Sequence, residues 1–110
     1  MDPDLINPKL TDEELFQKLN GETAQLSWKE LEPHFARGVV IRVAPELDLI
    51  EVAMSFIRDE STKIEALMSA GSVAAVNDDE AIRWSENKSS FWSVVIAPWI
   101  LIQENNTNSL

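Results

Sequence analysis

Residues 91–103, FWSVVIAPWILIQ, form the most apolar segment of the chain, and the predicted fold depends on them. Its β-branched and aromatic residues predict a strand. Apolar residues fall on both faces, as is typical of a strand that is central in a sheet or covered by other elements. Pro98 has no backbone N–H to donate to a ladder, so it should mark a bulge, an edge or a bend. We expect one bent strand.

Two shorter segments are expected to complete the sheet. Residues 39–43, VVIRV, form a β-branched run that Pro45 closes. Residues 73–76, VAAV, form a shorter candidate strand. The sequence therefore predicts a small three-stranded sheet.

Five helix starts are marked by a residue that can cap free N–H groups, each followed three positions later by Glu. These capping residues are Thr11, Ser27, Asp48, Thr62 and Asn77. Gly38 and Gly71 stand where glycine would end the second and fourth helices. Pro33 lies beyond the first turn of the second helix, so we expect a kink there or a break into two short turns.

The order helix, helix, strand, helix, helix, strand, helix, strand predicts an α+β fold with one core. We expect a single domain over residues 11–104, a flexible leader over 1–10 and a disordered tail over 105–110. From Ser27 onward the order also resembles a winged-helix topology, with the helix at 63–70 in the recognition position. That helix carries one Lys and one Glu, which makes it a poor reader of phosphates or bases.

The composition argues against several classes of function. The 110 residues include one His and no Cys, whereas metal, redox and nucleophilic sites rely on clusters of these residues. Nine Lys and Arg stand against nineteen Asp and Glu, giving a net charge of −10 that disfavours binding to phosphate backbones. We therefore expect no metal, no cofactor, no catalytic residues and no nucleic-acid partner.

The sequence also predicts a cytoplasmic protein without a membrane partner. Its longest apolar run, residues 94–102, is far shorter than the ~20 residues of a membrane helix. No basic segment precedes an apolar stretch at the N-terminus, as a secretion signal would require. Without Cys, nothing calls for an oxidising compartment.

The candidate ligand-binding residues are Glu30, His34, Arg37 and Asp48. Glu30 and His34 are four residues apart, which places them on one face of a helix, and Arg37 follows in the last turn. The alternative is structural: His34 interacts with a helical neighbour, and the helix dipole favours Arg37 where it stands. Without further His or Cys, the structural interpretation is the favoured one.

The candidate interface residues are Arg42, Trp92 and Trp99. Arg42 interrupts an apolar strand, so it faces solvent, pairs with a buried carboxylate or contacts a partner. Trp92 and Trp99 are an odd number of residues apart, so alternation along one strand places them on opposite faces. Helices from a chain of this size either cover only one sheet face well or cover both faces and bury both Trp side chains, and the sequence leaves these alternatives open. If only one face is covered, one Trp lies at a groove, a pocket or a subunit contact.

Four stretches taken together resemble the small bacterial proteins of domain-of-unknown-function family 2288. They are LNGETA leading to SWKEL (residues 19–24 and 27–31), PHFARG (33–38), PELDL (45–49) and APW (97–99). The resemblance covers residues 15–104. It implies a bacterial, cytoplasmic setting and supplies no catalytic residues.

These observations predict a module that acts by protein–protein contact, as a homo-oligomer or a small adaptor. The alternative is a small-ligand-binding protein or an enzyme with a pocket near Glu30, His34 and Arg37. A DNA-binding winged helix is the third interpretation, and the acidic charge argues against it.

Overall fold

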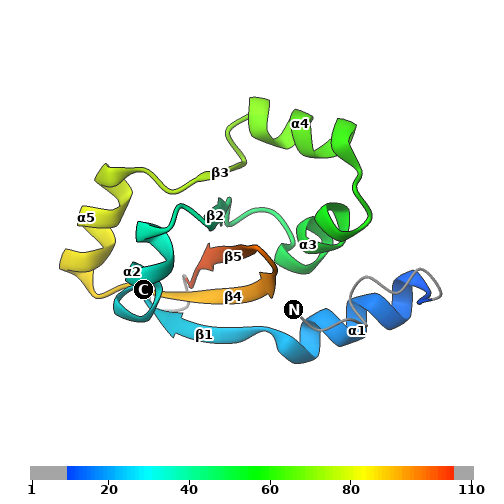
Figure 1. Cartoon of the computed structure of the whole chain (residues 1–110), viewed down its shortest axis with the longest axis horizontal. Helices are drawn as coiled ribbons and strands as arrows, with labels where there is room; N and C mark the ends of the chain where they lie inside the picture. The colour runs from blue at the N-terminus through cyan, green and yellow to red at the C-terminus, as the bar shows by residue number, and fades with distance from the viewer. Residues whose placement is uncertain (1–9, 106–110) are drawn as a thin grey trace.

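A mixed five-stranded sheet forms the centre of the computed structural model, which describes residues 10–105 (Figure 1). The strand order is β1-β4-β5-β2-β3. β2 and β5 are parallel, and the other neighbours are antiparallel. The strands are β1 (Ala24–Ser27), β2 (Val40–Val43), β3 (Val73–Ala75), β4 (Ser90–Ile96) and β5 (Trp99–Glu104). The predicted leader and tail, apart from Leu10 and Asn105, lie outside the described residues.

Five helices accompany the sheet in the described part of the chain, which confirms the α+β class. They are α1 (Asp12–Glu22), α2 (Trp28–Ala36), α3 (Leu49–Ile57), α4 (Ser61–Ser69) and α5 (Asp78–Asn87). No helix within residues 10–105 has the length and apolar character needed to cross a membrane.

Residues 91–103 form two strands, so the prediction of one bent strand is wrong. β4 and β5 pair antiparallel, with Ile96 opposite Trp99, and Ala97 and Pro98 form the tight turn between them. Pro98 cannot donate to a ladder, and here it stands in the turn, where no ladder bond is needed. The reversal brings β5 to the middle of the sheet, between β4 and β2.

The hairpin places Trp92 and Trp99 on the same face of the sheet. Trp92 lies opposite Gln103, and directly opposed residues share a face. Gln103 and Trp99 are an even number of residues apart on β5, so they share a face as well. The prediction of opposite faces is therefore wrong, because it assumed a strand that does not reverse.

The sheet has five strands rather than the predicted three. Besides the split of residues 91–103, the structure adds β1 at the sheet edge, where it pairs antiparallel with β4. The sequence of β1, AQLS, has no β-branched residue and gives little strand signal. The arrangement also differs from the winged-helix alternative, because β5 joins β2 in parallel at the centre of a larger sheet.

Local capping chemistry sets the start of most helices. Thr11, Ser27 and Asn77 each form a reciprocal capping box with the Glu three residues later. Asp48 accepts hydrogen bonds from two backbone N–H groups at the start of α3. The predicted cap at Thr62 is wrong, because α4 begins at Ser61 and the preceding Glu60 makes no side-chain cap. The tight turn at Asp59, whose φ is +55°, brings the chain into the helix before Thr62.

The predicted helix ends at Gly38 and Gly71 are confirmed. Both follow the last residues of α2 and α4 with φ of 75° and 76°, a left-handed conformation that glycine adopts without strain. α2 runs through Pro33 as a single helix, so the chain is not broken there.

Helices pack on both faces of the sheet, which is one of the two alternatives that the sequence left open. On one face α1 and α3 pack Leu15, Leu19, Val52 and Ala53 against Val94, Ile96 and Leu101. On the other face α2 and α5 pack Trp28, Leu31 and Trp84 against Phe91, Ile100 and Ile102. The second cluster is strongly aromatic, with the Trp84 and Phe91 rings 4.8 Å apart, edge to face.

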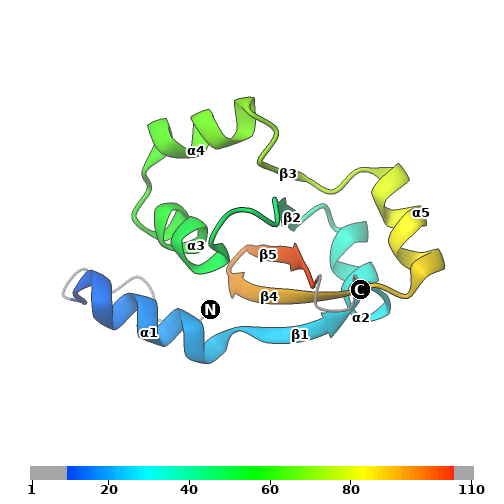
Figure 2. The same cartoon turned by 180° about the vertical axis from the view of Figure 1, so that it is seen from behind.

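α4 differs from the other helices, because none of its residues is buried. It contacts α3 and β3, and in both views it lies along the rim of the molecule, beyond the sheet (Figures 1 and 2).

Candidate functional site

The predicted ligand-binding residues do not converge. Glu30 accepts a hydrogen bond from the Ser27 backbone N–H, and the His34 Nδ1 atom lies 3.1 Å from an Arg37 guanidinium nitrogen. All three of these side chains belong to the α2 region, on the face of the sheet that α5 also covers. Asp48 caps α3, which packs against the opposite face. Among residues 10–105, no group of three or more His, Asp or Glu is placed to hold a metal ion.

Arg42 pairs with a carboxylate, one of the three interpretations of its place in the strand. Its Nε atom lies 2.6 Å from Oε2 of Glu80 on α5, and its side chain is 26% exposed against 12% for Glu80. A second guanidinium nitrogen donates to the Gly71 carbonyl at 3.3 Å. Arg42 thereby joins β2 to α5 and to the turn that follows α4.

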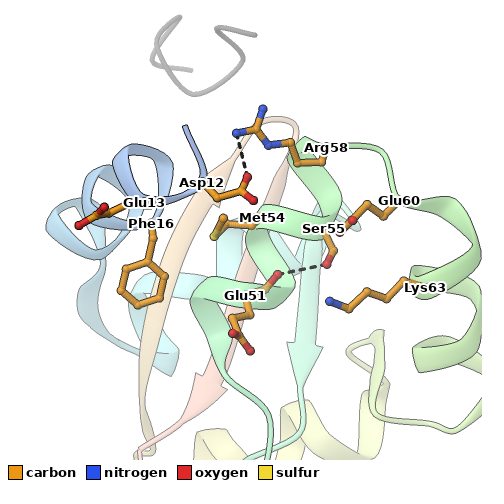
Figure 3. Close-up of a pocket in the computed structure, with 9 residues that line it drawn as sticks. All are labelled: Asp12, Glu13, Phe16, Glu51, Met54, Ser55, Arg58, Glu60 and Lys63. Carbon is orange, nitrogen blue, oxygen red and sulfur yellow. Dashed lines mark hydrogen bonds and ion pairs between the residues drawn. The ribbon is translucent and has the colours of Figure 1, made fainter. Parts of the chain in front are cut away.

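A groove of about 400 Å³ lies between α1, α3 and α4 (Figure 3). Each helix contributes to its lining because α1 and α4 both pack beside α3. The lining residues are Asp12, Glu13, Phe16, Glu51, Met54, Ser55, Arg58, Glu60 and Lys63. In Figure 3, Phe16 and Met54 lie toward the α1 end, and Glu60 and Lys63 toward the α4 end.

Negative charge predominates in the groove, with four carboxylates against two cations. Arg58 is engaged: it lies 3.2 Å from Asp12 Oδ1 and donates to the Leu10 carbonyl at 3.0 Å. Three carboxylates, those of Glu13, Glu51 and Glu60, then outnumber the remaining cation Lys63. The groove therefore presents a negative potential to a ligand.

The apolar part of the groove is formed by Phe16 and Met54. Phe16 follows Leu15, which together with Leu19 forms the buried stripe of α1, so its ring falls outside the core and is 38% exposed. The hydroxyl of Ser55 donates to the Glu51 carbonyl at 3.2 Å. The exposed Phe16 ring and Met54 together give the groove an apolar surface that a ligand could contact.

Two further hollows involve residues singled out in the sequence. Trp99 lines a hollow of about 280 Å³ with Pro98 and residues of α3 and α4. Trp92 and Asp48, predicted for different roles, line one hollow of about 400 Å³. Glu30, His34, Arg37 and Arg42 line none of these three hollows.

The sequence interpretation missed the groove residues, although one signal for them is present. In α1 the buried positions Leu15 and Leu19 follow the helical period, and Phe16 breaks it. A lone exposed aromatic residue is common on protein surfaces, so this signal gains meaning only from the groove around it. The carboxylates gave no such signal, because acidic residues are spread over the whole chain.

Comparisons with known proteins agree with the fold and assign no activity. The family described as "Protein of unknown function (DUF2288)" matches residues 14–104. The chain is similar to the NMR solution structure of PA1075 from Pseudomonas aeruginosa, with 43% identity and a TM-score of 0.74. That similarity covers 89% of this chain and 90% of the other. No curated protein matches the chain.

Proposed function

The chain belongs to the DUF2288 family of proteins of unknown function, and from its groove we propose that it is a protein-contact module. The docking surface is the groove between α1, α3 and α4. Its occupant is a segment of a partner protein in which an apolar side chain is flanked by Lys or Arg. The observation that carries the proposal is the exposed Phe16 ring amid an excess of carboxylates.

The apolar centre of the groove supplies the contact energy. Aromatic residues and Met are enriched in the buried cores of protein interfaces. Phe16 offers a rigid ring at little entropic cost, while the flexible Met54 side chain can adapt to its neighbour. An apolar residue of the partner would bury the exposed surfaces of Phe16 and Met54.

The charges determine what kind of partner fits. Glu13, Glu51 and Glu60 surround the apolar centre, and the whole chain carries a net charge of −10. Such a field attracts a basic segment and speeds its association. It disfavours a second copy of this acidic chain, because two copies would bring like charges together.

A small-ligand site or an active site at Glu30, His34 and Arg37 is less well supported. The Glu30 carboxylate caps its own helix, and His34 and Arg37 contact each other. The interface candidates Arg42, Trp92 and Trp99 lie outside the groove, and they are not part of this proposal. The cytoplasmic location and the bacterial origin expected from the sequence stay predictions.

An NMR titration of the full chain tests the proposal, with a short synthetic peptide of alternating Lys and Leu as the probe. We expect shift changes concentrated at the groove residues, and no binding of a matched Glu and Leu peptide. Phe16→Ala should weaken binding roughly tenfold, the loss typical of a removed interface anchor. Ile82→Ala is the matched control, because Ile82 is 57% exposed on α5, on the other sheet face.

Two results would overturn the proposal. The first is peptide binding that Phe16→Ala and Glu51→Gln leave unchanged while Ile82→Ala weakens it. The second comes from sedimentation equilibrium: a wild-type dimer that Phe16→Ala converts to a monomer would make a second copy the occupant.

A further inference from the structure

A separate hollow lies over β4 and β5, between the C-terminal end of α1 and the start of α3. Its volume is about 400 Å³. The lining residues are Asn20, Thr23, Asp48, Leu49, Ile50, Trp92 and Gln103. It shares no residue with the groove of Figure 3, so its ligand is independent of the proposed function.

Trp92 is the aromatic surface of this hollow. Its side chain points to the sheet face that α1 and α3 cover, yet it is 39% exposed because it lies where the two helices leave a gap. An exposed indole in a hollow presents a large apolar face that carries negative potential. Such a face binds apolar groups and cations.

Asp48 contributes a carboxylate of fixed orientation. Its Oδ1 atom accepts from the N–H groups of Ile50 at 2.9 Å and Glu51 at 3.2 Å. Its Oδ2 atom accepts no hydrogen bond from residues 10–105 in this arrangement. One oxygen therefore holds the helix start, and the other is available to a ligand.

Gln103 contributes a second acceptor. Its amide nitrogen donates to the carbonyls of Ala44 at 2.8 Å and Leu47 at 2.6 Å, which occupies both of its N–H groups. The amide oxygen is then the polar atom of Gln103 left for a ligand, since no described residue donates to it. Together with Asp48, it makes the polar lining rich in acceptors.

We propose that this hollow binds an organic cation, an alkylammonium or guanidinium group. The charge would lie over the Trp92 ring, and its N–H groups would donate to Asp48 and Gln103. No Lys or Arg lines the hollow, so an anion would find no counter-charge there. A single carboxylate is too few for a metal ion, whereas an organic cation can use the Trp92 ring, the Asp48 carboxylate and the Gln103 amide oxygen together.

The helix ends around the hollow do not oppose a cation. The N-terminus of α3 carries partial positive charge, but Asp48 already caps it with a full negative charge. The C-terminal end of α1 contributes the opposite, favourable partial charge, and Asn20 and Thr23 lie at that end. The net electrostatic environment is therefore negative.

NMR titrations of the full chain with butylammonium and butylguanidinium test the inference, with 1-pentanol as the neutral probe. The indole N–H signal of Trp92 should shift with both cations and not with the alcohol. Added salt should weaken the binding, because the attraction is partly between exposed charges. Spermidine and a Lys-containing tripeptide then identify where the bound cation comes from. Tighter binding of spermidine indicates a free polyamine, and tighter binding of the tripeptide indicates a protein side chain.

The decisive variant is Asp48→Asn, because Asn is as good a helix cap as Asp but carries no charge. It should fold normally and bind the cations at least tenfold more weakly, whereas Glu46→Gln in the same loop should bind as the wild type does. Trp92→Leu should also lose binding, while Trp99→Leu and Phe16→Ala should retain it. Unchanged affinity in Asp48→Asn, or equal shifts with 1-pentanol, would overturn the inference and leave the groove proposal untouched.

Discussion

The Nε atom of Arg42 on β2 lies 2.6 Å from Oε2 of Glu80 on α5. The other oxygen of the same carboxylate accepts the backbone N–H of Asn77 at 3.2 Å, which closes the capping box of α5. One side chain thus fixes the start of a helix and binds it to the sheet. The two roles are separable by mutation.

Glu80→Ala should lower the free energy of unfolding by about 1–3 kcal/mol, because it removes the acceptor of the Asn77 backbone N–H and the partner of the Arg42 cation. Glu80→Gln retains an oxygen for Asn77 and should cost less. Urea unfolding of both variants measures the difference, with Glu86→Ala on the exposed side of α5 as control. If Glu80→Ala and Glu86→Ala lower the free energy of unfolding equally, the Arg42–Glu80 pair contributes nothing to stability.

Ser27→Ala should lower the free energy of unfolding by about 0.5–2 kcal/mol, since Ser27 accepts the Glu30 N–H at the start of α2. Thr62→Ala is the matched control: Thr62 lies within α4 and caps nothing, so its replacement should change stability by less than about 0.5 kcal/mol. The urea midpoints of unfolding of Ser27→Ala and Thr62→Ala, each compared with the wild type, measure the two losses. A larger loss at Thr62 would place the start of α4 later in solution.

The features predicted correctly from the sequence are those set by neighbouring residues. The boxes at Thr11, Ser27 and Asn77 join atoms within three residues of each other, so the local sequence determines them. The glycine ends of α2 and α4 depend on the backbone of one residue. Such features need no knowledge of the rest of the fold.

The features missed depend on contacts between distant segments. A bent strand and a hairpin have the same apolar pattern on either side of Pro98, and the antiparallel pairing of β4 with β5 is what distinguishes them. The candidate groove combines α1 with α3 and α4, some forty residues later, so no local motif reveals it. The role of Arg42 also depends on a distant segment. Its position in the strand was compatible with three interpretations, and the structure pairs it with Glu80, 38 residues later.

Acid should remove one stabilising contribution at the start of α1. The Thr11 backbone N–H donates to the Glu14 carboxylate at 3.0 Å, and this bond, with a smaller effect of the Thr11 side chain, lowers the pKa of Glu14. A lowered pKa in the folded state stabilises the protein above the ordinary pKa of Glu, and the contribution is lost as pH falls through the lowered value. NMR titration of the Glu14 carboxyl should show the lowered pKa, and Thr11→Ala should return it only part of the way to the ordinary value, because the backbone N–H of residue 11 remains. An unshifted Glu14 would mean that the box is open in solution.

Ile96 and Trp99 face each other across the β4–β5 turn, yet their replacement should have different effects. Ile96 is buried in the cluster beneath α1 and α3, so Ile96→Ala should cost about 2–5 kcal/mol through lost burial and a cavity. Trp99 is partly exposed in the hollow beside α3 and α4, so Trp99→Ser should cost less. Because helices cover both sheet faces and the chain repels its own copies, we expect a monomer in sedimentation equilibrium at high micromolar concentration, for the wild type and Trp99→Ser alike. A wild-type dimer that Trp99→Ser dissociates would instead make Trp99 a contact between copies, as the sequence led us to consider.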